Sequence, residues 1–534
     1  SGFLEMEKVQ SNQMRYCLFL LLTGLFSHGL FAQSPDDALR YGFPLMGGTA
    51  RNMAIGGAMG SLGGDITAAH INPAGIGLYK NKEVVLSPGF KFYNNNFDYR
   101  TQQTQARENA FGYGTSGFVF GSQHDRSRNA SSSAFSISVN QLANYNNRIE
   151  YKGFNNFSSW SEQYVEELVR NRATIQQAEN NFIFGSSLAF WTFLVDTIAN
   201  ASGNVIGYQS LVPLPLNGTG PEGVVQHNLI ETSGGAHEVA LSFGNSYNDK
   251  LHLGLGIGVP IYSFNKNQTY REDDASGNTN NDFDFFEYKE RYSTSGFGFN
   301  MKMGLIYRPA ERWRLGLAFH TPTWANLNDQ ISSSITTNTE QYTIYPQPAT
   351  KSSDELRGNS NAGDYKYNLS TPYRAIGSVS FVINEVKDIK QQKGFVTADI
   401  EYVNYRSVRY RADDPSNTDD VNYYNDLNAI IKERFRPAFN LRLGGELKFK
   451  TIMGRAGFAY MGSPFANSEL KGTRMLLSGG LGYRNAGMFI DLTYQHALIQ
   501  QSHVPYYLED KPNPVADGRN SRGMVVLTVG FKFI

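Results

Sequence analysis

Apolar and polar positions alternate with a period of two along most of the chain after residue 84. Near the end of the chain, five apolar positions alternate with small or polar ones: Val525, Leu527, Val529, Phe531 and Phe533. The run from Leu251 to Ile261 shows the same pattern, with glycine at three of the intervening positions. A period of two places alternate side chains on opposite faces of a strand, so both segments predict strands with one apolar face.

This alternation predicts fourteen strands, and the connections between them are short and long in turn. The strands are expected at residues 84–93, 110–121, 133–143, 236–247, 251–264, 292–308, 313–327, 372–383, 396–410, 436–449, 452–460, 474–483, 488–496 and 524–534. The short turns are 248–250, 309–312, 450–451 and 484–487, and the long polar loops are 144–235, 265–291, 328–371, 411–435 and 497–523.

The loop lengths decide between two all-β architectures. A soluble sandwich also alternates, but it does not need short turns at one end and long loops at the other. An outer-membrane barrel needs both, together with an even number of strands. We therefore predict an all-β protein, an antiparallel transmembrane β-barrel of about fourteen strands in the cell outer membrane. We also expect an N-terminal plug, or hatch, in its lumen.

Composition excludes two other classes of protein. The chain has 534 residues, of which 13% are aromatic, and 48 basic residues balance 48 acidic ones. Mean hydropathy is −0.39, and no apolar run of 18 residues follows residue 32, so we do not expect transmembrane helices. A net charge of zero offers no basic field for phosphates, so we expect no nucleic-acid partner.

The N-terminal part predicts two segments that precede the barrel. Residues 14–32 have a basic start at Arg15, an apolar core and a small residue, Ala32, before Gln33, which indicates a signal peptide. It contains the single cysteine, Cys17. Residues 47–79 are rich in glycine and lack helical or strand periodicity, so we expect irregular backbone whose amides the barrel wall satisfies. The predicted division is signal peptide 14–32, hatch 33–81 and barrel 82–534.

The longest predicted loop, residues 144–235, is expected outside the cell and to contain helix. Ser159 and Glu162 have the spacing of a capping box, and three apolar residues then share one helical face: Trp160, Tyr164 and Leu168. An unusually apolar stretch follows, with aromatic residues at Phe182, Phe184, Phe190, Trp191 and Phe193. These five either form an entry groove for hydrophobic solutes at the barrel mouth or pack against one another within the loop.

Four stretches resemble the FadL/TodX family of outer-membrane transporters of hydrophobic compounds. The tetrapeptide Asn72-Pro73-Ala74-Gly75 is similar to a motif in that family's hatch. The other three stretches are similar to family strands: WRLGLAFHTPTWANLND at 313–329, ADIEYVNY at 398–405, and RAGFAYMGSPF at 455–465 with LSGGLGYRNAGMFIDLTY at 477–494. The resemblance covers nearly all of the chain after the signal peptide and implies a fourteen-stranded barrel with a hatch.

The resemblance also implies a function. Hydrophobic compounds such as long-chain fatty acids, or aromatic compounds, would bind in the lumen and leave sideways through a gap in the wall when the hatch shifts. The third predicted strand loses its alternation at Asn140 and Gln141, which matches the place of the wall kink in the family. The expected partners are these small molecules and outer-membrane lipid, and we expect a monomer.

Other candidate chemistry is weaker. Six charged residues at positions predicted to face the lumen are expected to brace the barrel: Asp399, Glu401, Arg442, Glu446, Lys448 and Asp491. The nine histidines lack metal-ligand spacing, and no Gly-x-Ser-x-Gly turn is present. We therefore expect no catalytic residues, metal or cofactor. A secretion or surface-assembly component, like the barrel shuttles of type IX secretion, remains an alternative function, and a membrane-embedded enzyme or adhesin is a third.

Overall fold

The computed structural model describes residues 35–42, 47–124, 130–215, 222–384, 393–468, 470 and 472–533. The predicted signal peptide at 14–32 lies outside the described residues. None of the helices in the described part of the chain has both the length and the apolar composition needed to span a bilayer.

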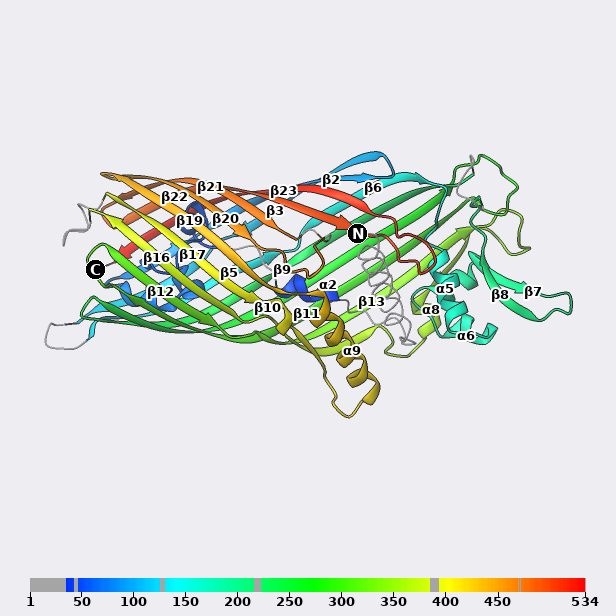
Figure 1. Ribbon diagram of the computed structural model, residues 1–534, viewed down its shortest axis with the longest axis horizontal. Coiled ribbons are helices and arrows are strands. Elements are labelled where there is room, and N and C mark those ends of the chain that lie inside the picture. Colours follow the sequence, from blue (N-terminus) through cyan, green and yellow to red (C-terminus); the bar gives the residue numbers. More distant parts are fainter. Residues whose placement is uncertain are drawn as a thin grey trace, which may run out of the picture.

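The described strands form a closed antiparallel barrel with fourteen strand positions (Figure 1). The barrel closes where β1 pairs with β23, with Lys82 opposite Phe533. In order round the wall, the positions are β1 (Lys82–Leu86) with β2 (Pro88–Tyr99), β3 (Gln102–Tyr113) with β4 (Ser116–Gln123), β5 (Ala130–Asn144), β9 (Val224–Tyr247), β10 (Leu251–Asp274), β11 (Phe285–Tyr307), β12 (Trp313–His320) with β13 (Trp324–Asn338), β15 (Asp364–Ser370) with β16 (Arg374–Ile383), β17 (Gly394–Asn404), β19 (Pro437–Phe449), β20 (Ile452–Met461), β21 (Arg474–Asn485), β22 (Met488–His503) and β23 (Ala516–Phe533). The prediction of a fourteen-stranded outer-membrane barrel is confirmed.

The outer face of β10 shows where the membrane ends. Five aliphatic side chains from Leu253 to Ile261 are 37–49% exposed on this face, as lipid-facing residues are. From Ser263 onward the outward positions are polar, yet the strand continues to Asp274. Residues 265–274, predicted as loop, remain strand because the ladders to β9 and β11 continue along them. The wall thus rises beyond the bilayer on this side.

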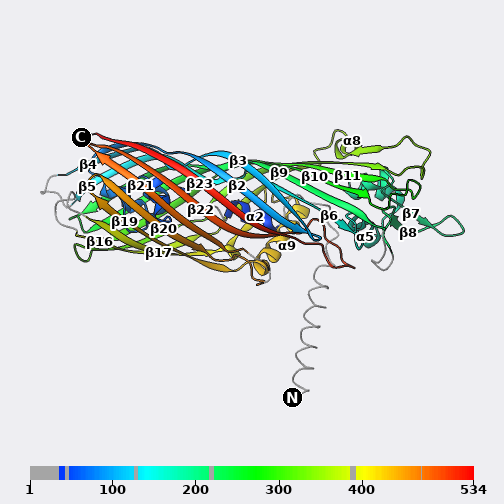
Figure 2. The same cartoon turned by 90° about the horizontal axis from the view of Figure 1, so that it is seen from above.

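A second group of elements extends the wall or lies outside it. Figure 1 shows the hairpin of β7 and β8, with α5, α6 and α8, at the end of the barrel opposite the C-terminus, and α9 projecting from the side. The view in Figure 2 shows the same arrangement from above. These elements are β6 (Asn147–Asn155), α5 (Glu162–Arg170), α6 (Ile175–Asn180), α7 (Ser186–Trp191), β7 (Val195–Ala199), β8 (Val205–Ser210), β14 (Ala349–Ser352), α8 (Ser353–Arg357), η3 (Tyr405–Ser407), β18 (Arg409–Ala412) and α9 (Thr418–Arg434).

Residues 47–79, which we call the inner segment, are almost wholly buried. They contain α3 (Ala50–Ala54), α4 (Ala68–Ile71) and η1 (Pro73–Leu78), and α2 (Pro35–Gly42) lies before them in the chain. Helix α3 contacts β20 to β23, whereas η1 contacts β5 and β9 to β11. The inner segment therefore touches strands on different sides of the barrel.

Glycines on the lumen side of the wall allow this close contact. A Cβ atom added to Gly254 would lie 2.2 Å from the backbone nitrogen of Ala74, and one added to Gly316 would lie 2.3 Å from the carbonyl oxygen of Gly60. Both distances are too short for any side chain. In β10, leucine and isoleucine thus face the lipid, whereas Gly254 on the opposite face lets the backbone of η1 approach closely.

Candidate ligand cavity and wall discontinuity

A cavity of about 600 Å³ lies above the inner segment. Gly47, the first residue of that segment, contributes to the lining, as do Val504 and Tyr507 from the external loop between β22 and β23. Apolar side chains form part of the lining: Leu39, Ile149, Ile230, Phe264, Phe465 and Ile499. The cavity therefore joins the external side of the barrel to the level of the inner segment.

Among the described residues, the charged side chains that line this cavity are all basic: Arg40, Lys91, Lys266, Arg434, Arg474 and Arg522. Two of them are neutralised by acids outside the lining. Arg40 lies 2.5 Å from Asp37, and Lys266 lies 2.8 Å from Glu290.

Lys91 and Arg522 have neutral partners instead. The Lys91 ammonium donates to Gln141 Oε1 at 2.9 Å, and the Arg522 guanidinium lies 5.2 Å from the centre of the Tyr93 ring. Arg474 is an electrostatic neighbour of Arg522.

The barrel wall is interrupted beside the cavity. The ladder between β4 and β5 ends with Ser116 opposite Val139. Above this level, among the described residues, β3 pairs with β2 alone and β6 pairs with β9 alone. This break has β3 on one side, and β6 and the end of β5 on the other. We call it the wall discontinuity. The predicted kink residues Asn140 and Gln141 lie at its lower end, and the register of β5 against β9 shifts between Gln141 and Ala143.

Side chains bridge the discontinuity in place of a ladder. The Asn95 amide donates to Asn147 Oδ1 at 2.8 Å, and the Asn144 amide donates to the Phe111 carbonyl at 3.1 Å. Tyr113 from β3 stacks on His237 of β9 and lies within hydrogen-bond distance of it. These contacts are fewer than the backbone bonds of a ladder, so this part of the wall is expected to separate more easily than its neighbours.

The inner segment begins against the lower end of the discontinuity. A Cβ atom on Gly47 would lie 2.8 Å from the carbonyl oxygen of Gln141. On the other side of the break, a Cβ atom on Gly114 would lie 1.9 Å from the carbonyl oxygen of Gly48. Two adjacent glycines of the inner segment therefore contact the two edges of the discontinuity, and neither contact leaves room for a larger residue.

The predicted hatch motif lies deeper in the lumen. The Asn72 amide nitrogen donates to the Gly60 carbonyl at 2.6 Å, and the carbonyls of Leu305 and Leu317 lie 3.2 and 3.3 Å away. Its oxygen accepts from the Ala74 amide at 3.1 Å and caps η1, whose first residues are Pro73, Ala74 and Gly75. Asn72 thus joins two parts of the inner segment to β11 and β12.

A buried charged cluster holds the neighbouring helix α4. His70 Nδ1 lies 2.8 Å from Glu238, and His70 Nε2 lies 3.0 Å from the Ser138 hydroxyl. The Lys302 ammonium also bonds to Glu238, at 2.7 Å. Each charged group has an opposite partner, so the cluster attaches α4 to β5, β9 and β11 without leaving an isolated charge in the lumen.

The lumen charges identified from sequence fall into similar pairs. Glu401 pairs with Arg442, and the Arg455 guanidinium bonds to both Glu446 and Asp491 at 2.6 Å. Asp399 accepts from the Gly60 amide at 2.9 Å and therefore also holds the inner segment. Among the described residues there is no group of three or more histidine, cysteine or acidic side chains placed to bind a metal.

The five aromatic residues of the predicted entry groove do not line the cavity. They lie in residues 156–215, which contain α5, α6, α7, β7 and β8 and which we call the external cap. Phe184 is buried, Phe182 and Phe190 are half-buried beside the apolar cluster round Leu188, and Trp191 is 43% exposed. Phe193 stacks on the ring of Tyr345.

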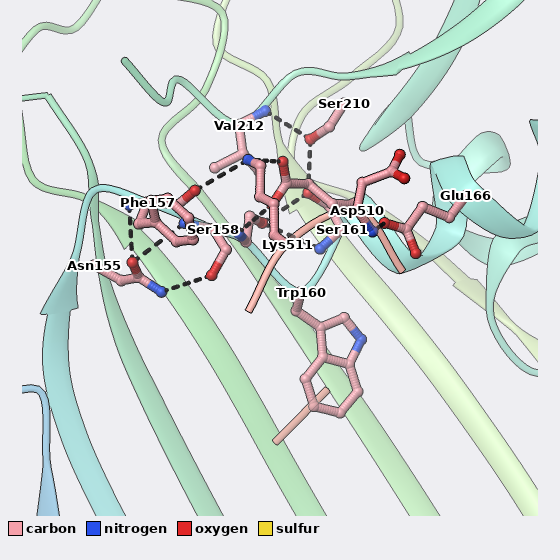
Figure 3. A network of polar contacts seen from close by, with 12 residues as sticks. Asn155, Phe157, Ser158, Trp160, Ser161, Glu166, Ser210, Val212, Asp510 and Lys511 are labelled. Atoms are coloured by element: carbon pink, nitrogen blue, oxygen red, sulfur yellow. Dashed lines mark hydrogen bonds and ion pairs between the residues drawn. The ribbon is translucent and has the colours of Figure 1, made fainter. Parts of the chain in front are cut away.

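Polar contacts join the cap to the loop between β22 and β23 (Figure 3). The Lys511 ammonium donates to the Phe157 carbonyl at 3.0 Å, and the Asp510 amide donates to Glu166 at 3.4 Å. In the same region, Glu272 accepts from Ser159 and from the Trp160 amide. Glu272 lies on the part of β10 beyond the membrane, and burial raises its pKa to about 7.

The basic residues that line the cavity were not identified from the sequence, although the pattern round Lys91 indicated one of them. Lys91 lies between Phe90 and Phe92, which are 43% and 39% exposed on the outer face. A charge placed between two lipid-facing aromatic residues must point into the lumen. The same signal cannot show that Lys91 meets Arg522, because alternation gives the face of a strand and not the neighbour across the barrel.

Comparison with solved structures finds the same architecture in transport proteins. A FadL homologue from Pseudomonas aeruginosa is 15% identical, with a TM-score of 0.53, and the match covers 92% of this chain and 100% of that one. The toluene transporter TodX from P. putida is 11% identical, with a TM-score of 0.50, covering 91% and 99%. No protein-family model and no curated protein matches the chain. The chain therefore has the fold of the FadL/TodX family of outer-membrane transporters.

Proposed function

We propose that this protein is an outer-membrane channel for the passive uptake of hydrophobic compounds such as long-chain fatty acids. The observation that carries the proposal is the cavity of about 600 Å³, which joins the external loops to the wall discontinuity at Tyr113 and Gln141. This volume is in the range of small-molecule sites, roughly 300–1,000 Å³. The toluene transporter TodX, which shares the fold, supports the choice of hydrophobic ligands.

We further propose that ligand leaves sideways through the wall discontinuity. Phe111 of β3 lies beside the discontinuity, and Phe118 of β4 lies in the ladder to β5 just below it. The two side chains are 66% and 53% exposed on the outer face. An opening beside these side chains would face acyl chains instead of water. A hydrophobic solute could then move from the cavity to the bilayer without crossing an aqueous layer.

Residues 33–81 act in this proposal as a hatch that moves only locally. The inner segment is bonded to strands on several sides of the lumen, for example through Asn72, His70 and Asp399. Displacing it whole would break many buried hydrogen bonds, each contributing about 1 kcal/mol. A shift of Gly47 and Gly48 away from the two edges of the discontinuity disturbs few of these bonds. We therefore assign the motion to these glycines and the anchoring role to Asn72, Pro73, Ala74 and Gly75.

A cross-link across the discontinuity tests the proposal. Asn95→Cys with Asn147→Cys places two thiols where the native amides bond at 2.8 Å, and Cys17 is the only cysteine of the sequence. Proteoliposomes with this variant should take up labelled fatty acid when reduced and lose uptake after treatment with a short thiol cross-linker. If the cross-linker attaches to the two cysteines through disulfide bonds, reducing these bonds should restore uptake.

The matched control joins two strands whose ladder is continuous. Ser295→Cys with Asn328→Cys lies at opposite positions of β11 and β13, so its cross-link should leave uptake unchanged. Equal uptake by the two cross-linked variants would refute the lateral route. If the wild-type protein takes up no hydrophobic compound, the transport proposal fails and an assembly or secretion role becomes the better hypothesis.

A further inference from the structure

We propose that the lipid-facing wall carries a binding site for a phosphate-bearing lipid of the outer leaflet. An apolar hollow over β16 would hold an acyl chain, and basic side chains on its external side would hold the phosphate. The hollow, which we call the outer hollow, has a volume of about 480 Å³. Its lining comes from five neighbouring strands of the wall: β11, β12, β16, β17 and β19.

Small residues of β16 create the outer hollow. In the ladders, Ala375 lies between Phe319 of β12 and Tyr402 of β17, and Gly377 occupies the next outward position of β16. The larger side chains on both sides therefore stand above β16 and leave a depression that opens to the bilayer. Apart from the hydroxyl of Tyr402, the side chains that line it are apolar, so an acyl chain fits it better than water does.

Four aromatic rings mark the external edge of the outer hollow: Phe319, Tyr373, Tyr402 and Phe439. In this order, successive ring centres lie 6.1, 6.3 and 5.4 Å apart. Aromatic residues of membrane proteins concentrate where the acyl region meets the head groups. A lipid whose chain lies in the outer hollow therefore has its head group just beyond these rings.

Basic side chains face outward at this level, and we call them the basic row: Lys366 of β15 with Arg409 and Arg411 of β18. The residues next to them in the strands, Tyr367 and Tyr410, are buried, so alternation places the basic row on the outer face. Arg409 lies opposite Ser370, which in turn lies opposite Trp324. The Trp324 side chain is 47% exposed, as expected at the boundary of the membrane.

The basic row has no acidic partner among the described residues. The Arg409 guanidinium donates to the carbonyls of Arg406 and Val408, and these neutral groups leave its charge uncompensated. Acidic residues follow two positions further from the membrane along each segment, at Asp364 and Asp413. An anionic head group at the level of the rings therefore meets positive charge before it meets negative charge.

Arginine favours phosphate over other head groups. A guanidinium group binds phosphate through two parallel hydrogen bonds, which a neutral hydroxyl head group cannot accept in the same way. Ser370, opposite Arg409, precedes Ala375 by five residues, so at most about 18 Å of chain separates the basic row from the outer hollow. One leaflet with its head groups is about 20 Å thick. A single lipid molecule can therefore contact both parts of the site.

A second copy of the chain fits this face less well than a lipid does. A two-fold interface brings the same patch of both subunits together, so the basic row of each copy would lie close to that of the other. Like charges at such a distance repel each other. The charge of the basic row thus favours an anionic lipid as the occupant of the outer hollow.

Native mass spectrometry of the purified protein in a neutral detergent tests the inference. The protein is titrated with dioleoyl phosphatidate and, separately, with dioleoylglycerol, which has the same chains and no phosphate. Contacts of the arginines with the anionic head group predict that the phosphatidate binds about tenfold or more tightly. A wild-type protein that binds the two lipids equally would overturn the inference without any variant.

Two double variants locate the head-group part of the site. Arg409→Gln with Arg411→Gln should reduce the affinity ratio to about threefold or less, because the guanidinium contacts are lost. The matched control, Arg107→Gln with Arg519→Gln, removes the same charge from exposed positions of β3 and β23 and should keep the ratio. A ratio that survives the first change, or that falls equally in the control, would overturn the assignment.

Gly377→Leu tests the acyl-chain part of the site. A Cβ atom at Gly377 would lie 3.5 Å from the Ile400 side chain, an ordinary contact, so the variant should fold. Leucine fills the outer hollow and should weaken the binding of both lipids; unchanged binding would overturn the role of the hollow. Wild-type dimers that Gly377→Leu dissociates would assign the hollow to a second copy of the chain and would also overturn the inference. None of these measurements involves uptake, so they are separate from the tests of the proposed function.

Discussion

Replacement of Asn72 by alanine should loosen the inner segment locally. The side chain is 1% exposed and makes its shortest hydrogen bond, 2.6 Å, to the Gly60 carbonyl. It also accepts from the Ala74 amide at 3.1 Å. Alanine removes both bonds and leaves the two buried backbone groups without this partner. The nearby carbonyls of Leu305 and Leu317 belong to paired positions of β11 and β12, so they are less affected.

The expected cost follows from these two bonds. Leaving a buried backbone group without its partner costs about 1–3 kcal/mol, so we expect about 3 kcal/mol for the two groups together. If the whole cost lowers the free energy of local unfolding, the fraction of molecules in which residues 60–79 are locally unfolded rises about a hundredfold. Hydrogen–deuterium exchange by mass spectrometry on peptides covering these residues measures this change directly.

Asn52→Ala is the matched control. Asn52 is equally buried in the inner segment, but its amide nitrogen makes a single hydrogen bond, to the Gly47 carbonyl at 3.2 Å. Its replacement should accelerate exchange by about tenfold or less, since one bond of about 1 kcal/mol is lost. Two results would show that Asn72 does not anchor the segment. In one, the exchange rate of residues 60–79 changes less than threefold in Asn72→Ala. In the other, it rises as much in Asn52→Ala as in Asn72→Ala.

Two further predictions concern the external cap and the fit of the inner segment. The Glu272 carboxyl on β10 has an ordinary pKa of 4.5 in the unfolded chain and a pKa of about 7 where it is buried against the external cap. Between these two pH values, the folded protein therefore retains a proton that the unfolded chain releases. Stability should therefore be highest below pH 4.5 and fall by about 3 kcal/mol as the pH rises to 7. Glu272→Gln should abolish this trend in thermal unfolding followed by tryptophan fluorescence, and an unchanged trend would assign it to another group. Gly254→Ala would place a Cβ atom 2.2 Å from the Ala74 nitrogen, whereas the same change at Gly454 meets nothing within 4 Å. Gly254→Ala should lower the yield of folded protein, measured as the heat-modifiable band on gels, and Gly454→Ala should not. Similar yields of the two variants would mean that η1 can move away from β10.

The sequence predicted the barrel because strand pairing in a membrane imposes a strict pattern. Side chains of a strand alternate between lipid and lumen, so Leu253 and Leu255 could be assigned to one face without any knowledge of their neighbours. The strand ends were less predictable. Residues 265–274 carry polar side chains on the outward face, and only the ladders with β9 and β11 keep them in the strand.

By itself, therefore, the sequence determined the number of strands, the lipid-facing residues and the presence of an irregular glycine-rich segment before them. Only the tertiary structure showed that Gly47 and Gly48 meet the wall at its discontinuity, that Asn72 bonds to β11 and β12, and that Lys91 and Arg522 share one cavity. The physical reason is that alternation fixes the face on which a side chain lies. Its partner across the lumen depends on the closure and stagger of the whole barrel, which bring together residues from opposite ends of the chain.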